Sequence, residues 1–243
     1  MTTVFDRRLF GEQNAKTSKG EVKGVKTLIL YLAPEKTASS AMGKTVNVCP
    51  YATKGCADSC LFTSGRGVMA PVHKSRVEKT VAFLKNRHLF LEKLAKEIRA
   101  GIKRAKRDNM TLAVRLNGTS DLPILEMSLA PQFPGVQFYA YTKVPPMNDA
   151  RRHLPNVHLT YSYSEDHRAA VLLPLLLNKG QNVAVVFDVK KGAALPVNWK
   201  GWPVYDGDVD DLRFMDPKGV IVGLRAKGKA RKDTSGFVQK AFP

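Results

Sequence analysis

Three clustered cysteines are the clearest chemical feature of the sequence. Cys49, Cys56 and Cys60 are separated by six residues and then by three, and they are all the cysteines in the chain. A disulfide framework would leave one thiol unpaired and is rare in a reducing cytosol, so metal binding explains the cluster better. Three buried cysteines that share a segment by chance are the alternative, because buried cysteine is often inert.

The number of thiols separates the candidate metals. Thiolates favour zinc, copper(I) and iron–sulfur clusters. Structural zinc usually has four ligands, and His73 is the only nearby histidine that could complete a set with the three cysteines. A four-iron cluster held by three cysteines keeps one iron open to a substrate or cofactor. We therefore expect Cys49, Cys56 and Cys60 to bind a [4Fe-4S] cluster, with zinc as the alternative.

Apolar strands and helical segments alternate along the chain. A continuous apolar run predicts a strand at 27–32 that is buried on both faces. Five further strands are expected at 111–116, 136–141, 157–161, 183–187 and 220–224. Helical spacing of apolar residues covers 71–107, with a break at Asn86, and a second helix is expected at 167–178. This α/β alternation predicts mostly parallel strands built from βαβ units, with the cysteine loop after strand one.

One domain is expected to contain all six strands. It covers 27–225, between a loose, basic N-terminal arm at 1–26 and a flexible, basic C-terminal tail at 226–243. In folds of this type the carboxyl ends of the strands form one rim that carries the site. Polar residues that follow the second and fourth strands are therefore candidate site residues: Asn117, Gly118, Ser120, Asp121, Ser162, Ser164 and Glu165. Ordinary turns and helix caps are the alternative for each of them.

The charge of the chain favours an acidic partner. Lys and Arg number 39 against 21 Asp and Glu, which gives a formal net charge of +18. Nucleic acid is such a partner, and a solvated basic surface is the alternative because the charges are spread along the chain. The basic face of 71–107, which includes Arg76, is expected to be solvated, with nucleic-acid contact as the alternative.

No segment predicts contact with a membrane. A membrane-spanning helix needs about 18 or more consecutive apolar residues, and no window of the sequence approaches that length. The N-terminal residues MTTVFDRRLF also lack the apolar stretch of a secretory signal. We therefore expect a cytoplasmic protein, while the sequence does not indicate an oligomeric state.

The sequence resembles two known groups of proteins. A strand, a cysteine loop and five further strand units follow one another as in the radical S-adenosylmethionine enzymes. This resemblance implies an α/β fold with a partial (β/α)6 TIM-like barrel. The cysteines of those enzymes are usually spaced by three residues and then two. The run NVCPYATKGCADSCLFTSGRG, with the later segments RLNGTSD, FYAYTK and YSYSE, is similar to the phage gene-product-eighty-eight family. This second resemblance spans most of the chain and implies a viral or prophage source, with the protein in the host cytoplasm.

The radical-enzyme resemblance implies a function. Cys49, Cys56 and Cys60 would bind the cluster, and its open iron would chelate S-adenosylmethionine, whose reductive cleavage produces a radical. The residues after the second strand, Asn117, Gly118, Ser120 and Asp121, and those after the fourth, Ser162, Ser164 and Glu165, would contact this cofactor. With the basic charge, the substrate would be nucleic acid or a nucleotide. The alternative is a non-enzymatic phage protein that binds nucleic acid or a host protein and has a structural iron–sulfur or zinc site.

Overall fold

Six parallel strands lie side by side in the order in which they occur in the sequence. The computed structural model describes residues 4–11 and 17–242. The six strands are β2 (Val25–Leu30), β3 (Thr111–Arg115), β4 (Gln137–Thr142), β5 (Val157–Ser162), β6 (Val183–Phe187) and β9 (Ile221–Arg225). All six fall within two residues of their expected bounds. β2, β3 and β6 are buried along most of their length, as expected for strands covered on both faces, whereas β5 is only partly buried. The predicted α/β class and the mostly parallel sheet are thus confirmed.

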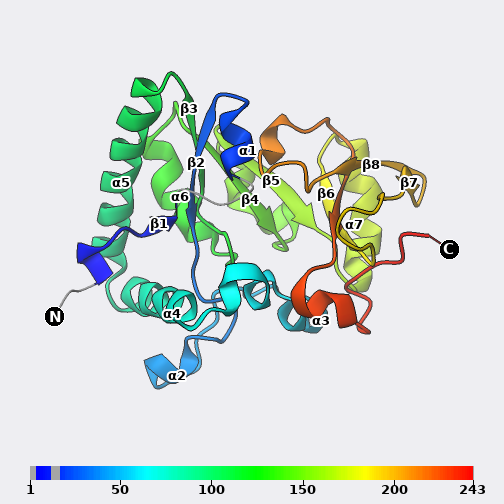
Figure 1. The fold of residues 1–243 in the computed structure, drawn as a ribbon, viewed down its shortest axis with the longest axis horizontal. Coiled ribbons are helices and arrows are strands. Elements are labelled where there is room, and N and C mark those ends of the chain that lie inside the picture. Colours follow the sequence, from blue (N-terminus) through cyan, green and yellow to red (C-terminus); the bar gives the residue numbers. More distant parts are fainter. Residues whose placement is uncertain (1–3, 12–16, 243) are drawn as a thin grey trace.

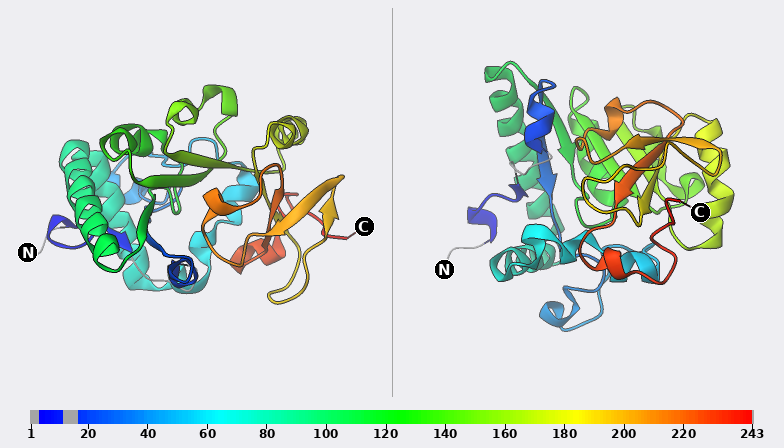
Figure 2. Two further views of the ribbon diagram at one scale, coloured as in Figure 1. Left: turned by 90° about the horizontal axis from the view of Figure 1, so that it is seen from above. Right: turned by 45° about the vertical axis from the view of Figure 1, so that its right-hand side comes forward.

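Three shorter strands extend this sheet to nine. β1 (Phe10–Gly11) pairs antiparallel with β2, and β8 (Trp202–Asp206) pairs parallel with β9 and antiparallel with β7 (Asn198–Trp199). The strand order is β1-β2-β3-β4-β5-β6-β9-β8-β7, so β1 and β7 are the two edges of an open sheet. The sheet bends strongly, with helices on its outer side (Figures 1 and 2).

The helices connect and cover the strands. The α-helices are α1 (Thr17–Glu21), α2 (Ser39–Met42), α3 (Lys54–Asp58), α4 (Ala70–Lys85), α5 (Arg87–Arg107), α6 (Pro123–Leu129) and α7 (His167–Asn178). Asn86 separates α4 from α5, as predicted, and its side chain caps α5 by accepting a hydrogen bond from Leu89 N at 3.3 Å. Short 3₁₀ helices complete the chain: η1 (Val4–Asp6), η2 (Leu61–Thr63), η3 (Gly65–Val68), η4 (Ala130–Gln132), η5 (Pro146–Asn148), η6 (Ala150–His153), η7 (Arg213–Met215) and η8 (Gly228–Lys232). In the part of the chain that is described, no helix combines the length and apolar character that a membrane span requires.

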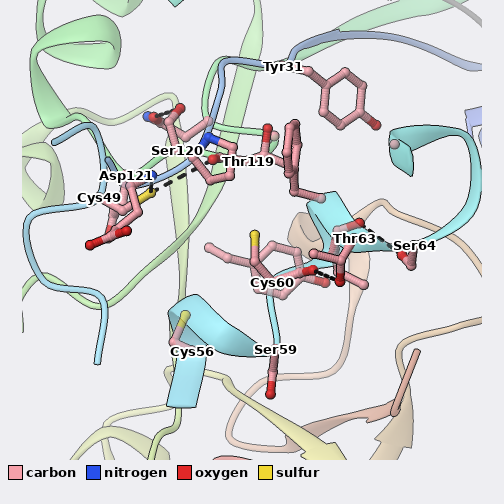
Figure 3. Close-up of a pocket in the computed structure, with 18 of the residues that line it drawn as sticks. Tyr31, Cys49, Cys56, Ser59, Cys60, Thr63, Ser64, Thr119, Ser120 and Asp121 are labelled. Atoms are coloured by element: carbon pink, nitrogen blue, oxygen red, sulfur yellow. Dashed lines mark hydrogen bonds between the residues drawn. The ribbon is translucent and has the colours of Figure 1, made fainter. Parts of the chain in front are cut away.

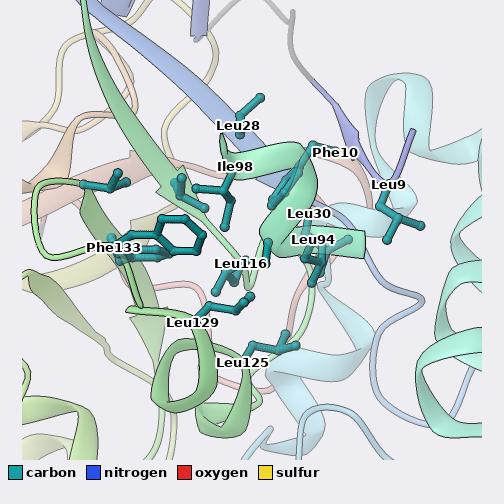
Figure 4. Packing of buried hydrophobic residues seen from close by; sticks show 14 of the residues in the cluster. Leu9, Phe10, Leu28, Leu30, Leu94, Ile98, Leu116, Leu125, Leu129 and Phe133 are labelled. Atoms are coloured by element: carbon teal, nitrogen blue, oxygen red, sulfur yellow. The ribbon is translucent and has the colours of Figure 1, made fainter. Parts of the chain in front are cut away.

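The largest hydrophobic core fixes α5 to the first strands of the sheet. Leu94 and Ile98 lie one turn apart on α5 and pack with Leu28, Leu30 and Leu116, and all five are almost fully buried (Figure 4). Burying a side chain of this size contributes about 1.5–3 kcal/mol. This packing anchors β2 and β3, whose carboxyl ends carry the cysteine segment and the 117–121 loop.

The N-terminal segment packs against this core. Leu9 and Phe10 are buried, and the Glu97 carboxylate accepts hydrogen bonds from their backbone N–H groups at 2.9 and 3.1 Å. The prediction of a loose arm therefore does not hold for these residues, because two apolar side chains outweigh the basic composition of the segment. Residues 1–3 and 12–16 of that predicted arm lie outside the described residues.

Candidate functional site

A cavity of about 1240 Å³ opens at the carboxyl ends of the six parallel strands. Its wall includes Tyr31 after β2, Asn117 after β3, Lys143 after β4, Ser162 at the end of β5 and Lys227 after β9. Ligands bind at this end of parallel α/β sheets. The volume exceeds the roughly 300–1,000 Å³ of a usual small-molecule site, so the cavity has room for a cofactor together with a second ligand.

All three cysteines line this cavity. Cys49 follows the loop after β2, Cys56 lies in α3, and Cys60 comes just before η2. Figure 3 shows their side chains on the wall of the same hollow. The sulfur of Cys49 accepts a hydrogen bond from the Glu35 backbone N–H at 3.4 Å and lies 3.7 Å from the Thr119 carbonyl oxygen. The loop therefore brings together residues that the sequence separates by six and three positions.

The described residues do not form a ready-made site for a single metal ion. Across residues 4–11 and 17–242, no group of three or more His, Cys, Asp or Glu side chains is arranged to hold a metal ion. A tetrahedral zinc ion with thiolates at about 2.3 Å would need sulfurs about 3.8 Å from one another. His73, the expected fourth zinc ligand, is exposed and packs on the Phe62 ring with centroids 5.0 Å apart. The zinc alternative thus lacks its ligand set in this conformation.

Burial keeps the metal-free thiols protonated. It raises the pKa of Cys49 to about 12 and also raises the pKa values of Cys56 and Cys60. Lys143 opposes this shift at Cys56 through its charge. Since the thiolate is the nucleophile in thiol exchange, the raised pKa values argue against thiol–disulfide chemistry. Thiolates at these positions would need a positively charged partner.

Glu165 fixes the helix that carries Cys56. Its Oε1 accepts a hydrogen bond from Gly55 N at 2.7 Å, and its Oε2 accepts one from the Thr53 hydroxyl at 2.9 Å. The Thr53 oxygen in turn caps α3 by accepting from Cys56 N at 3.3 Å. Both carboxylate oxygens are therefore engaged with α3, which gives Glu165 a positioning role instead of the direct cofactor contact that the resemblance implied.

The C-terminal segment 228–241 packs directly on α3, and the two lie side by side in Figure 1. A Cβ atom on Gly55 would come within 2.1 Å of Ser235 Oγ and 2.7 Å of Phe237 Cβ, so glycine allows the close approach. The backbone of Gln239 continues along β6, donating to Val186 O at 2.8 Å. The tail predicted to be flexible is thus ordered up to these residues, because Phe237 is buried against the cysteine segment.

Arg151 organises a buried group of carboxylates beneath the rim. Its side chain is fully buried and forms ion pairs with Asp149 at 2.7 Å, and with Asp121 and Glu126 at 3.2 Å each. It also donates a hydrogen bond to Thr142 Oγ1 at 2.8 Å. Burial raises the pKa of Glu126 to about 7, and burial likewise raises that of Asp121. Asp121, a predicted cofactor residue, therefore also holds the fold together.

The other predicted residues after β3 both stabilise the loop and line the cavity. Asn117 donates to Glu126 at 2.9 Å, and the Ser120 hydroxyl donates to Asn117 Oδ1 at 2.7 Å. Both residues are buried, yet both line the cavity together with Gly118 and Asp121. The structure therefore brings this loop next to the cysteines, with much of its hydrogen-bonding capacity already used.

Lys143 connects three parts of the candidate site. Its ammonium group donates to Ser162 Oγ at 2.7 Å and lies 5.1 Å from the centre of the Phe237 ring. Ser162 lines the cavity, whereas Ser164 is buried and does not belong to its wall. Lys143 thus links β4, β5 and the C-terminal segment beside Cys56.

Two arginines of the cavity wall had no distinguishing signal in the sequence. Arg76 on α4 faces the cavity beside Tyr31 and Phe62, although it belongs to a helix face that was expected to be solvated. Arg115 at the end of β3 lines the same wall and pairs with Asp211. The partners of both arginines come from other parts of the chain. The spacing of residues in the sequence therefore did not identify these two arginines.

Comparison with known proteins gives one match. No curated protein and no solved structure matches the chain. The family model described as Gene product 88 matches residues 8–241, which include the three cysteines, all six parallel strands and the C-terminal segment on α3. The resemblance seen in the cysteine run is thereby confirmed, and the chain belongs to the Gene product 88 family.

Proposed function

We propose that the chain is an iron–sulfur enzyme of the radical S-adenosylmethionine type, with a [4Fe-4S] cluster bound by Cys49, Cys56 and Cys60. One observation carries this proposal: the three thiols line one cavity at the carboxyl ends of parallel strands. The cavity volume of about 1240 Å³ supports it, because a cofactor and a substrate both need space beside the cluster.

The number of cysteines supports a cluster over a single structural zinc ion, which usually has four ligands. A four-iron cluster is itself several ångströms across, so its cysteine sulfurs need not lie within the short distance that zinc requires. The backbone N–H of Glu35 directed at the Cys49 sulfur is the kind of hydrogen bond that tunes such clusters. The chain has three cysteines, so one iron would have no thiolate ligand.

The arrangement of the strands also supports the proposal. A partial (β/α)6 barrel is built from six parallel strands in sequence order, and β2, β3, β4, β5, β6 and β9 follow that order. In the radical enzymes the cysteine loop follows the first of these strands, as it follows β2 here. The open sheet leaves one end of the cavity to be covered by α3 and the 228–241 segment.

In the proposed reaction, different residues of the chain would orient the cysteines and contact the cofactor. When bound, the cluster supplies the electron that cleaves the sulfonium C–S bond of S-adenosylmethionine, which yields methionine and a 5′-deoxyadenosyl radical. Glu165 and Thr53 orient α3 and with it Cys56. Gly118 and Ser120, next to the Cys49 side of the wall, would contact the cofactor together with Ser162. The basic charge of the chain makes a nucleotide or nucleic acid the proposed substrate.

Anaerobic reconstitution followed by product analysis tests this function. The protein is incubated with S-adenosylmethionine and a one-electron reductant, and 5′-deoxyadenosine and methionine are measured. We expect both products from the wild type and neither from Cys56→Ser, whereas Asp58→Ser, an exposed change on the same helix, should leave them unchanged. An intact four-iron cluster that does not cleave S-adenosylmethionine would remove the radical-enzyme assignment.

The second candidate is a non-enzymatic protein that binds nucleic acid or a host protein, with the cysteines in a structural metal site. An exposed basic face on α5 favours it: Lys96, Arg99, Lys103, Lys106 and Arg107. Phosphate contacts from this face would make binding fall steeply with salt concentration. Retention of fold and nucleic-acid binding in Cys56→Ser would contradict a structural metal, because such a metal contributes directly to folding.

A further inference from the structure

Arg76 belongs to the cavity wall and carries a guanidinium donor that the described residues leave unpaired. Its guanidinium lies over the Tyr31 ring at 4.7 Å and near the Phe62 ring at 5.3 Å from the centroids. Among the described residues, Arg76 Nη1 is buried and has no hydrogen-bond partner. Buried charged donors without a partner are costly and uncommon, so the position requires an explanation.

Arg115 has a similar arrangement on the wall of the same cavity. Its guanidinium lies 4.8 Å from the centre of the Tyr141 ring, and its Nη1 donates to both Asp211 oxygens at 2.9 and 3.1 Å. Its Nε is buried and finds no partner in the described part of the chain. Both guanidinium groups belong to residues that line the same cavity as Tyr31.

The stacking fixes the planes of the two guanidinium groups at the cavity wall. An aromatic ring attracts the face of a guanidinium group and fixes its plane, while its N–H bonds stay in that plane. Planar N–H donors match the oxygens of carboxylate and phosphate groups. The cavity wall also carries seven basic side chains against three acidic ones, and one of the three, Asp211, is already paired with Arg115.

We infer that Arg76, together with Arg115, forms a subsite for the anionic group of the molecule on which the enzyme acts, either a phosphate or a carboxylate. The inference rests on the proposed function in that the same cavity would hold the cluster and the substrate. Arg76 lies near the ring of Phe62, which follows Cys60 by two residues, so the subsite lies on the Cys60 side of the cavity. Lys143, beside Cys56, marks a different part of the wall. The substrate would thus be held by its charged end with its remainder directed toward the cysteines.

Titration calorimetry with two simple anions tests the subsite. Anaerobically reconstituted protein is titrated with inorganic phosphate and, separately, with acetate at constant ionic strength. We expect one of the two to bind, which also identifies the class of anionic group. Arg76→Gln should weaken this binding at least tenfold, and Arg76→Lys should weaken it less because the charge is kept. Absence of binding by both anions would overturn the inference.

A matched control and a cysteine variant separate this inference from the proposed function. Lys74→Gln removes the same charge from an exposed position on α4 and should leave anion binding unchanged. Equal affinity in the wild type and Arg76→Gln, with iron content intact, would overturn the subsite and leave the cluster proposal standing. Phosphate or acetate binding that depends on Arg76 in a protein without iron would keep the subsite and remove the proposed function.

Discussion

Two groups of charged side chains lie near the ends of the same strands and differ in how far the protein satisfies them. Around Arg151, every guanidinium nitrogen donates to a carboxylate or hydroxyl oxygen, and the side chain is fully buried. Around Arg76, aromatic rings fix the guanidinium plane, and Nη1 has no partner among the described residues. Since buried polar groups are normally paired, the first group holds the rim together, and we infer that the second belongs to a ligand site.

Replacement of Arg151 should have the largest effect on stability. Arg151→Met would leave Asp121, Glu126 and Asp149 buried without their counter-charge, and we expect a loss of about 3–5 kcal/mol. Chemical denaturation followed by circular dichroism measures the free energy of unfolding. Arg152→Met, an exposed neighbour, should cost less than about 1 kcal/mol. Similar losses in both variants would contradict this prediction, because the ion pairs around Arg151 would then not be what stabilises the rim.

Removal of Glu165 should affect both stability and cluster binding. Glu165→Ala loses two hydrogen bonds to α3, and we expect a loss of about 3 kcal/mol. The iron content after reconstitution should also fall several-fold because Cys56 is no longer held in place. Glu92→Ala, an exposed glutamate on α5, is the matched control and should change neither quantity. Full iron content in Glu165→Ala would show that this residue does not position the cysteine helix.

The stability of the Arg151 group should depend on pH. Burial raises the pKa of Glu126 from 4.5 to about 7. The folded state therefore binds this proton more tightly than the unfolded chain, so the contribution is present below pH 4.5 and is lost as the pH rises through 7. Between about pH 5 and about pH 8, the free energy of unfolding of the wild type should fall by about 2 kcal/mol more than that of Glu126→Gln. Urea titrations at both pH values measure this difference, and equal pH dependence would contradict it.

Replacement of Arg76 should have the smallest effect on stability. Arg76→Gln loses stacking on Tyr31 and Phe62 but also removes a buried donor without a partner, so the two changes offset each other. We expect a change of less than about 1 kcal/mol, measured by the same denaturation experiment as for Arg151→Met. A loss as large as that of Arg151→Met would make Arg76 a structural residue and would remove the contrast between the two groups.

Continuous apolar runs were sufficient to predict the six parallel strands, and Asn86 was a sufficient signal for the break between α4 and α5. The same reasoning placed the cysteine loop and the 117–121 loop at one rim. It could not predict the contacts of Arg151, because most of its partners lie in separate parts of the chain, in the loop after β3, in α6 and in β4, and meet only after the sheet forms. The basic residues of the C-terminal segment predicted a flexible tail. The packing of Phe237 on α3 was missed because the two are far apart in the sequence.

The iron and sulfide content of the reconstituted protein tests the central claim most directly. If Cys49, Cys56 and Cys60 hold a [4Fe-4S] cluster, we expect about four irons and about four sulfides per chain, with the broad visible absorption of a brown protein. Each single change of these cysteines to serine should sharply reduce that content. A colourless protein with one zinc per chain, or iron that is retained after all three changes, would contradict the account.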